Sequence, residues 1–293
     1  MVTAGQREGE SGMATGAPDP PSRSPKAGRD LPAAIAVGVV LGAAIIVSLL
    51  TVRQLFLGIV GLAVVISSVE LAGALRRGAG SRVSLLPVLV GGQAMLWLTW
   101  PFGLTGLFVA FTITVLGCMG WRLREGADGY LRDVTASVFT AAYVPMFAAF
   151  AGMLVRPEDG ALRVLCFMIG VVASDTGGYA LGVLFGRTPM APKVSPKKSW
   201  EGFGGSMLVG TIAGGLSVAL LLGGQWWQGV LFGAALVCSA TIGDLTESLL
   251  KRDLGVKDMG NLLPGHGGLM ERMDSLLPSA VLSWMMLSWL VPA

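Results

Sequence analysis

The stretch SLLKRDLGVKDMGNLLPGHGGLMERMD, residues 248–274, lies between two apolar segments, residues 229–250 and 275–291. Each apolar segment is long enough to cross the ~30 Å hydrocarbon core of a bilayer as a helix. The stretch between them holds clustered glycines, basic and acidic residues, and His266, the only histidine of the chain. Charge is costly next to hydrocarbon, so this pattern favours a functional site between two membrane helices.

The rest of the chain has the composition of a membrane protein. Of its 293 residues, 53% are hydrophobic and 13% are charged, and the mean hydropathy is +0.69. A soluble domain has about twice that charged fraction. Nine apolar segments therefore predict an all-α polytopic integral membrane protein with about nine transmembrane helices, at residues 33–50, 55–75, 83–100, 102–121, 134–154, 163–186, 204–222, 229–250 and 275–291. Pro101 and Gly103 predict a tight turn between the third and the fourth of these segments.

Lysine and arginine are distributed unequally between the two sides of these helices. Eighteen of them fall on the side of the N-terminus, and three, Arg53, Arg156 and Arg163, fall on the other side. Cytoplasmic loops are enriched in Lys and Arg. We therefore predict a multi-pass protein of the cell membrane whose N-terminus is cytoplasmic and whose C-terminus is outside.

Composition also divides the chain. Residues 1–31 hold Pro, Gly, Ser and mixed charges without an apolar run, which predicts a disordered cytoplasmic tail. Residues 32–155 are predicted to form the N-terminal transmembrane helices, and residues 156–293 a C-terminal catalytic transmembrane region. The cytoplasmic loops of that region are predicted at 186–203 and 251–274.

Four acidic residues lie within or at the ends of the apolar segments: Glu70, Asp175, Asp244 and Glu247. A carboxylate at membrane depth costs a few kcal/mol, so a functional role is the first interpretation. Asp244 and Glu247 are three residues apart and share one helix face. For Glu70 two interpretations stay open, because a functional carboxylate and an ion pair with the nearby Arg76 or Arg77 are equally compatible with the sequence.

Oxygen ligands of this kind predict a magnesium site. The candidate ligands are Asp244, just before residues 248–274, and Glu271 and Asp274, at the end of that stretch. Carboxylates suit Mg²⁺, which usually binds through one or two of them together with substrate phosphates. The substrate is therefore expected to carry phosphate.

Hydroxyl and cationic side chains near these acids could bind such a substrate: Ser195, Lys197, Lys198, Ser199, Ser248, Lys251, Arg252, Lys257 and Arg272. Tyr179 lies four residues after Asp175 and could donate to it or to a ligand. For His266, a phosphate contact or a role in positioning the loop is favoured over a general base. Basic residues in loops also set the topology of a membrane protein, so they do not by themselves indicate a binding site. The prediction of a phosphate site rests on their occurrence together with serine, glycine and carboxylate residues in the same two loops. The chain lacks the G-x-x-x-x-G-K-[ST] motif, which excludes a P-loop NTPase.

Residues 248–274 resemble the signature of the phosphatidate cytidylyltransferase (CDP-diacylglycerol synthase) family, S-x-x-K-R-x-x-x-x-K-D-x-x-x-x-x-P-x-H-G-G-x-x-D-R-x-D. The segments GDLTES (243–248), SPKKSWEG (195–202) and DTGGYALGVLFGR (175–187) are also similar to the family pattern. The resemblance is close in the C-terminal half, and over the first 130 residues it extends only to hydropathy. One position departs from the signature, where Glu271 stands in place of an aspartate.

The resemblance implies transfer of the cytidylyl group of CTP to phosphatidate, giving CDP-diacylglycerol and pyrophosphate in phospholipid biosynthesis. The lipid phosphate would attack the α-phosphorus with the assistance of Mg²⁺ bound by Asp244, Glu271 and Asp274. The resemblance also implies a second, monovalent cation such as K⁺. The residues assigned to catalysis are Asp244, Lys251, Arg252, His266 and Asp274, and those assigned to substrate and phosphate binding are Ser195, Lys197, Lys198, Ser199, Ser248, Lys257, Arg272, Asp175 and Tyr179.

The expected partners are CTP, phosphatidate and the lipid bilayer, and no nucleic acid. Faces rich in small residues are compatible with a homodimer. The active site is expected to face the cytoplasm. Two alternatives stay open: a CTP-using kinase of a lipid alcohol, such as a polyprenol or phytol kinase, and a transporter, for which no internal duplication is visible.

Overall fold

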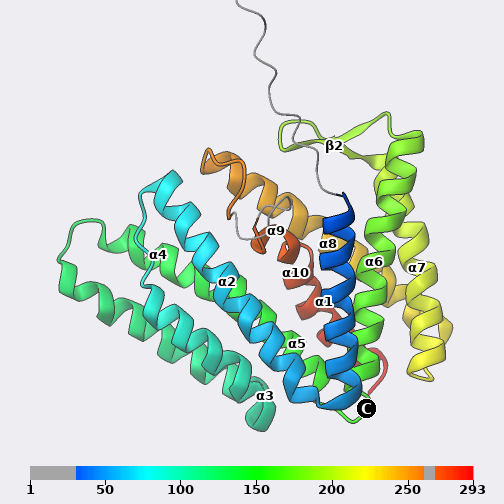
Figure 1. Cartoon of the computed structure of the whole chain (residues 1–293), viewed down its shortest axis with the longest axis horizontal. Coiled ribbons are helices and arrows are strands. Elements are labelled where there is room, and N and C mark those ends of the chain that lie inside the picture. Colours follow the sequence, from blue (N-terminus) through cyan, green and yellow to red (C-terminus); the bar gives the residue numbers. More distant parts are fainter. Residues whose placement is uncertain (1–30, 261–267, 293) are drawn as a thin grey trace, which may run out of the picture.

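The computed structural model describes residues 31–260 and 268–292, and it is built almost entirely from helices (Figure 1). The predicted all-α membrane class is confirmed. The main helices are α1 (Leu31–Thr51), α2 (Arg53–Ala79), α3 (Leu85–Arg122), α4 (Tyr130–Ala141), α5 (Phe147–Val155), α6 (Gly160–Phe185), α7 (Trp200–Leu221), α8 (Trp226–Asp253), α9 (Met270–Met273) and α10 (Leu276–Leu290). The shorter elements are the 3-10 turn η1 (Leu123–Glu125), the π-turn η2 (Ala142–Met146) and the strands β1 (Pro189–Ala191) and β2 (Ser195–Ser199).

Six helical segments in the described part of the chain are long and apolar enough to cross a membrane: Arg53–Ala79, Leu85–Glu125, Tyr130–Val155, Gly160–Phe185, Trp200–Leu221 and Trp226–Asp253. The chain is therefore a multi-pass membrane protein. The predicted segments 83–100 and 102–121 both lie in α3, and the segment 275–291 corresponds to α10, which is only 15 residues long.

Helix α3 is two helices joined by a tight turn. Pro101 lacks an amide hydrogen, and Gly103 has φ 58° and ψ −137°, which interrupts the helix there. Beyond the turn the halves run antiparallel, because a Cβ on Gly91 would lie 1.9 Å from Thr114 Oγ1 and one on Gly117 would lie 3.6 Å from Pro87 Cβ. The turn predicted at Pro101–Gly103 is present, and the chain reverses there (Figure 1).

The loops expected at 186–203 and 251–274 contain short elements of regular structure. Within 186–203, β1 and β2 form an antiparallel hairpin in which Pro189 pairs with Ser199 and Ala191 with Ser195. Within 251–274, α8 continues to Asp253 and α9 occupies Met270–Met273. Hydropathy could not show this, because a helix can continue past its apolar section once its polar groups reach water.

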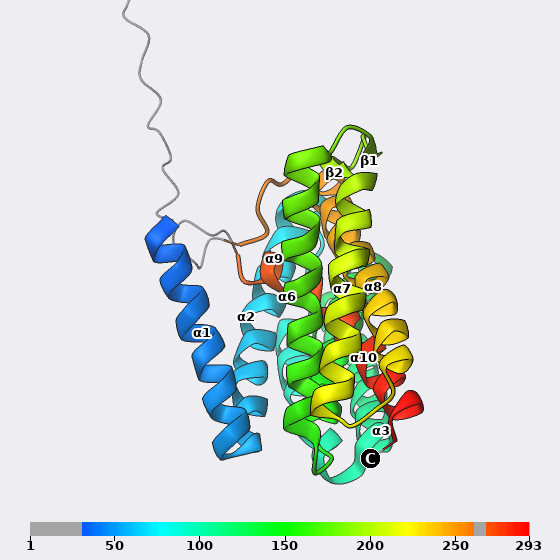
Figure 2. The ribbon, with the colours of Figure 1, turned by 90° about the vertical axis from the view of Figure 1, so that its right-hand side faces the viewer.

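Helices α6, α7 and α8 form one packed layer (Figure 2). Their glycines bring backbones into direct contact: a Cβ on Gly214 of α7 would lie 2.4 Å from the carbonyl oxygen of Gly229 in α8. Small residues allow this approach between membrane helices. Helix α10 packs against α8 and α5, and α2 packs against α3.

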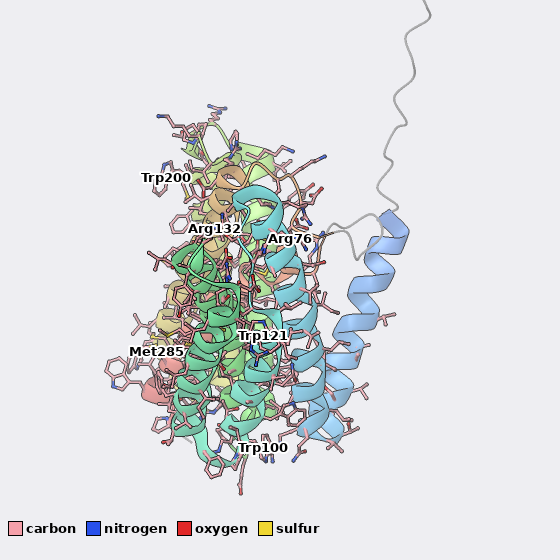
Figure 3. All side chains as sticks on the ribbon, turned by 90° about the vertical axis from the view of Figure 1, so that its left-hand side faces the viewer. Arg76, Trp100, Trp121, Arg132, Trp200 and Met285 are labelled. Carbon is pink, nitrogen blue, oxygen red and sulfur yellow. The ribbon has the colours of Figure 1, made fainter. Side chains whose placement is uncertain are left out.

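The three arginines predicted on the non-cytoplasmic side all bind backbone carbonyl groups. Arg53 donates to Pro157 O, and Arg156 donates to Pro101 O at 3.5 Å. Arg163 donates to two carbonyls at the end of α10, at 3.0 and 2.7 Å, and to Asp159 at 2.8 Å. Arg163 thus binds the end of α10, whereas Arg53 binds the connection between α5 and α6 and Arg156 binds the break in α3. Figure 3 shows Arg76 and Arg132 toward one end of the molecule and Trp100 at the other.

We expect Arg163→Ala to lower the free energy of unfolding by about 3 kcal/mol, because it removes the side-chain donor of Val291 O and Asp159 and one of the two donors of Leu287 O. Arg163 is only 2% exposed, so water cannot readily replace the guanidinium. Thermal unfolding in detergent measures the loss. Arg156→Ala is the matched control, and since Arg156 is exposed its expected change is within about 0.5 kcal/mol. Equal midpoints for the two variants would contradict this account.

Candidate functional site

A cavity of about 220 Å³ lies between α6, α7, α8 and the β1–β2 hairpin. Six residues predicted from sequence line it, namely Asp175, Tyr179, Lys197, Lys198, Ser199 and Asp244. They come from three separate segments of the chain. The cavity therefore places two lysines and two carboxylates around one space.

The floor of the cavity is made of small residues. A Cβ on Gly178 would lie 2.4 Å from Ser206 Oγ, and one on Gly177 would lie 2.6 Å from Gly205 O. Ser206 donates to Ser174 O at 2.7 Å, which joins α7 to α6 below the cavity. Ser174, Gly178 and Ser206 of this contact line the cavity, so small residues form part of its wall.

The hairpin turns the two lysines back toward the helices. Ser199 ends β2 and caps α7, its Oγ accepting from Gly202 N at 3.1 Å. Glu201 accepts from the backbone N–H of Arg187 at 3.2 Å and of Thr188 at 3.1 Å, which fixes the other end of the hairpin. Capping thus accounts for Ser199 in the structure, and its hydroxyl still lines the cavity.

Lys198 and Asp244 form an ion pair inside the cavity. Lys198 Nζ lies 2.5 Å from Asp244 Oδ2, with side chains 28% and 31% exposed. Lys197, its neighbour on β2, is exposed and also lines the cavity. The hairpin therefore supplies one paired and one solvent-facing cation.

Asp274 lies beside Asp244, between α9 and α10. Burial raises the pKa of Asp274, and the charges of Asp244 and Glu247 raise it further. Like charges held together in this way require a cation or a proton. The two carboxylates can meet because residue 243 is glycine: a Cβ there would lie 2.2 Å from Asp274 O and 2.7 Å from Pro278 Cγ.

Two predicted catalytic cations at the end of α8 have partners within the protein. Lys251 Nζ lies 2.7 Å from Glu247 Oε2, one helical turn earlier. Glu247 is 2% exposed, and its Oε1 has no hydrogen-bond partner among the described residues. Arg252 donates to Val194 O in the turn of the hairpin. Arg252 thus links α8 to the hairpin that carries Lys197 and Lys198.

Glu271 accepts hydrogen bonds from two backbone groups, Met259 N at 2.7 Å and Gly268 N at 2.5 Å. Within residues 31–260 and 268–292, no group of three or more His, Cys, Asp or Glu side chains is arranged to hold a metal ion. The structure therefore brings Asp274 to Asp244 and directs Glu271 to the backbone.

The remaining predicted residues are dispersed. Ser195 begins β2, Ser248 is half-buried on α8, and Lys257 is exposed after α8. Arg272 lines a second cavity, of about 270 Å³, which is otherwise apolar and lies between α1, α2, α5, α6 and α10. His266 lies outside the described residues.

Tyr143 was not predicted from sequence. It belongs to the π-turn η2 and is 7% exposed, and its hydroxyl has no hydrogen-bond partner in the described part of the chain. That hydroxyl is within electrostatic range of Asp274, Glu247 and Asp244. The available sequence signal is a tyrosine two residues before Pro145 inside an apolar segment, since π-turns are frequent at functional sites.

Comparison with known proteins extends over nearly the whole chain. The model of the cytidylyltransferase family matches residues 32–290, so the resemblance is not limited to hydropathy over the first 130 residues, as the motifs had indicated. A phosphatidate cytidylyltransferase of Mycobacterium leprae is 50% identical over 283 residues, which is 91% of this chain and 90% of that protein. One of Mycobacterium bovis is 48% identical over 284 residues, 92% of each chain. One of Haemophilus influenzae is 41% identical over 125 residues, 41% of this chain and 43% of that protein.

Proposed function

Because the chain belongs to the cytidylyltransferase family, we propose that it joins CTP and phosphatidate to give CDP-diacylglycerol and pyrophosphate. The observation that carries this proposal is the match to relatives of that name at 48–50% identity over 90–92% of both chains. We propose that the reaction takes place at the cavity lined by Lys197, Lys198 and Asp244, and the charges gathered there support this.

In the proposed reaction, an oxygen of the lipid phosphate forms a bond to the α-phosphorus of CTP. The bond from that phosphorus to the oxygen bridging to the β-phosphate breaks, and pyrophosphate leaves with the electron pair. A phosphate monoester is already ionised at neutral pH, so no strong general base is required. The protein has to hold two anions together, for which Lys197 and Lys198 are suitably placed.

Asp244 and Asp274 offer the oxygen donors that Mg²⁺ prefers, and their proximity calls for a cation. We propose that these two carboxylates hold the ion. Bound Mg²⁺ would neutralise charge on the phosphate oxygens. Glu271 is a further candidate ligand, although both of its oxygens already accept from backbone N–H groups. A second cation such as K⁺ stays a prediction from the family.

We propose nine membrane crossings, with the N-terminus and the active site in the cytoplasm and the C-terminus outside. Counting the halves of α3 separately and including α1 and α10 raises six spans to nine. The distribution of basic residues supports the orientation. The apolar cavity lined by Arg272 is suited to the acyl chains of the lipid. A homodimer stays a prediction. Gly214 and Gly229 do not argue for it, because they pack against each other within one chain.

The test uses purified protein in detergent with CTP, Mg²⁺ and phosphatidate, with and without EDTA. We expect pyrophosphate and CDP-lipid in equal amounts, both dependent on the metal. Phosphorylation of a lipid alcohol by CTP, with no product from phosphatidate, would instead identify a lipid kinase. Absence of any CTP turnover under all these conditions would contradict both enzyme assignments and favour a transporter.

A further inference from the structure

Helix α2 holds the segment that joins α8 to α9, although the two are about 200 residues apart in sequence. Two of its side chains reach this segment, one at each side. Glu70 Oε2 accepts from Met270 N at 2.8 Å. Arg77 Nη2 donates to Met259 O at 2.8 Å. Residues seven apart lie on the same face of a helix, so both contacts come from one face of α2.

Glycines allow Glu70 to enter between the two sides of this segment. A Cβ on Gly260 would lie 2.1 Å from Glu70 Oε1, and one on Gly268 would lie 2.7 Å from Glu70 Oε2. Any larger residue at either position would push the carboxylate out. Glu70 Oε1 is buried and has no hydrogen-bond partner among the residues that the structure describes. The position is thus a costly one for a carboxylate.

Glu271 joins the two ends of the same segment, because its carboxylate accepts from both Met259 N and Gly268 N. Met259 and Met270 are fully buried, in one core cluster with Leu71 of α2 and Tyr143. Both ends of the segment are therefore anchored by side-chain packing and by hydrogen bonds to their backbone. We call the described ends of this segment, residues 259–260 and 268–270, the neck. We call Glu70, Arg77 and Glu271, which bind its backbone, the neck clamp.

The clamp can affect the candidate site because two site residues, Arg272 and Asp274, follow Met270 closely in the chain. Arg272 lies two residues and Asp274 four residues after Met270. Ser67, one turn before Glu70, donates to Met273 Sδ at 3.5 Å, which adds a contact between α2 and this part of the chain. A shift of Met270 would be passed to Asp274, which must stay beside Asp244.

We propose that Glu70 and Arg77 are positioning residues that set Asp274 and Arg272 relative to Asp244 by holding the neck from α2. This gives a role to a helix of the N-terminal half, which the family match at residues 32–290 also covers. The effect on turnover rests on the proposed function, whereas the effect on the neck itself does not.

The experiment compares Glu70→Ala, Glu70→Gln, Arg77→Ala and Arg77→Lys with the control Arg76→Ala in the full chain. Arg76 neighbours Arg77 and is exposed, and no hydrogen bond or ion pair joins it to another described residue. Amide hydrogen exchange of peptides covering 257–274 reports the neck directly. CDP-lipid formation, measured as kcat and as KM for CTP, reports the site.

For both alanine variants we expect faster exchange at residues 259 and 268–270 and a loss in kcat on the order of 10- to 100-fold. The KM for CTP should change less than about threefold, because the hairpin lysines are untouched. Glu70→Gln and Arg77→Lys each keep one hydrogen bond to the backbone, so both should recover most of the kcat. Arg76→Ala should match the wild type.

Exchange and kcat unchanged in Glu70→Ala and Arg77→Ala would overturn the proposal. A second result would also overturn it: Glu70→Gln shows the amide exchange of the wild type but is as inactive as Glu70→Ala. The negative charge of Glu70 would then act on the reaction itself, and not through the position of the neck. If Glu70→Ala fails to fold, Arg77→Ala and its rescue by Arg77→Lys decide the question, because Arg77→Ala removes the hydrogen bond to Met259 O and Arg77→Lys can restore one. If the wild type forms no CDP-lipid, the proposed function fails, and the exchange data still test the clamp.

Discussion

Asp244→Asn should abolish CDP-lipid formation while leaving the fold intact. Asp244 is the residue at which the pairing with Lys198, the contact with Asp274 and the proposed Mg²⁺ site coincide. Asparagine keeps the shape of the side chain and removes its charge, so we expect kcat to fall by at least about 100-fold. Removing a negative charge from the cavity should not weaken CTP binding, so the loss should lie in turnover.

The measurements are kcat, the Kd for CTP without metal, and the unfolding midpoint. Asp253→Asn is the matched control, because Asp253 ends the same helix and is exposed. We expect Asp253→Asn to retain full turnover. If Asp244→Asn keeps a kcat within a few fold of the wild type, then Asp244 is not a ligand of an essential ion.

Gly243→Ala should impair both activity and stability, although it adds a single methyl group. That methyl would lie 2.2 Å from Asp274 O, and backbone cannot move aside as a flexible side chain does. Helix α8 and the start of α10 must then separate, which moves Asp244 away from Asp274. We expect a kcat loss of about 100-fold and a loss of about 1–3 kcal/mol in the free energy of unfolding.

Gly204→Ala on α7 is the matched control for this substitution. A Cβ at Gly204 meets nothing within 4 Å, so alanine should leave activity unchanged and stabilise the helix by about 0.5–1 kcal/mol. Activity assays and thermal unfolding on the two variants separate close packing from helix propensity. Wild-type turnover in Gly243→Ala would show that the carboxylates do not need this spacing.

Part of the site could be predicted from the sequence because its signals are local. Spacing alone placed Asp175 and Tyr179 one turn apart, and both line the cavity with Lys197, Lys198 and Asp244. The partners of those residues could not be predicted. Arg252 reaches Val194 O and Lys251 pairs with Glu247, because helix ends and a hairpin meet there only after the bundle has packed.

Glu70 illustrates the same limit. The sequence left it between a functional role and an ion pair with Arg76 or Arg77. In the structure its carboxylate accepts from Met270 N, and Arg77 turns to Met259 O. Both partners are backbone groups, which no side-chain pattern indicates, and both lie more than 180 residues away.

The sequence by itself determined the membrane class, the turn at Pro101–Gly103 and the family, because hydropathy, proline and glycine geometry and motif spacing act over a few residues or turns. Tertiary structure alone decided which carboxylates meet, which cations are already paired, and that α2 holds the neck before α9. Those outcomes depend on how closely whole helices approach. That approach is set by glycines such as Gly243, whose neighbours come from distant parts of the chain.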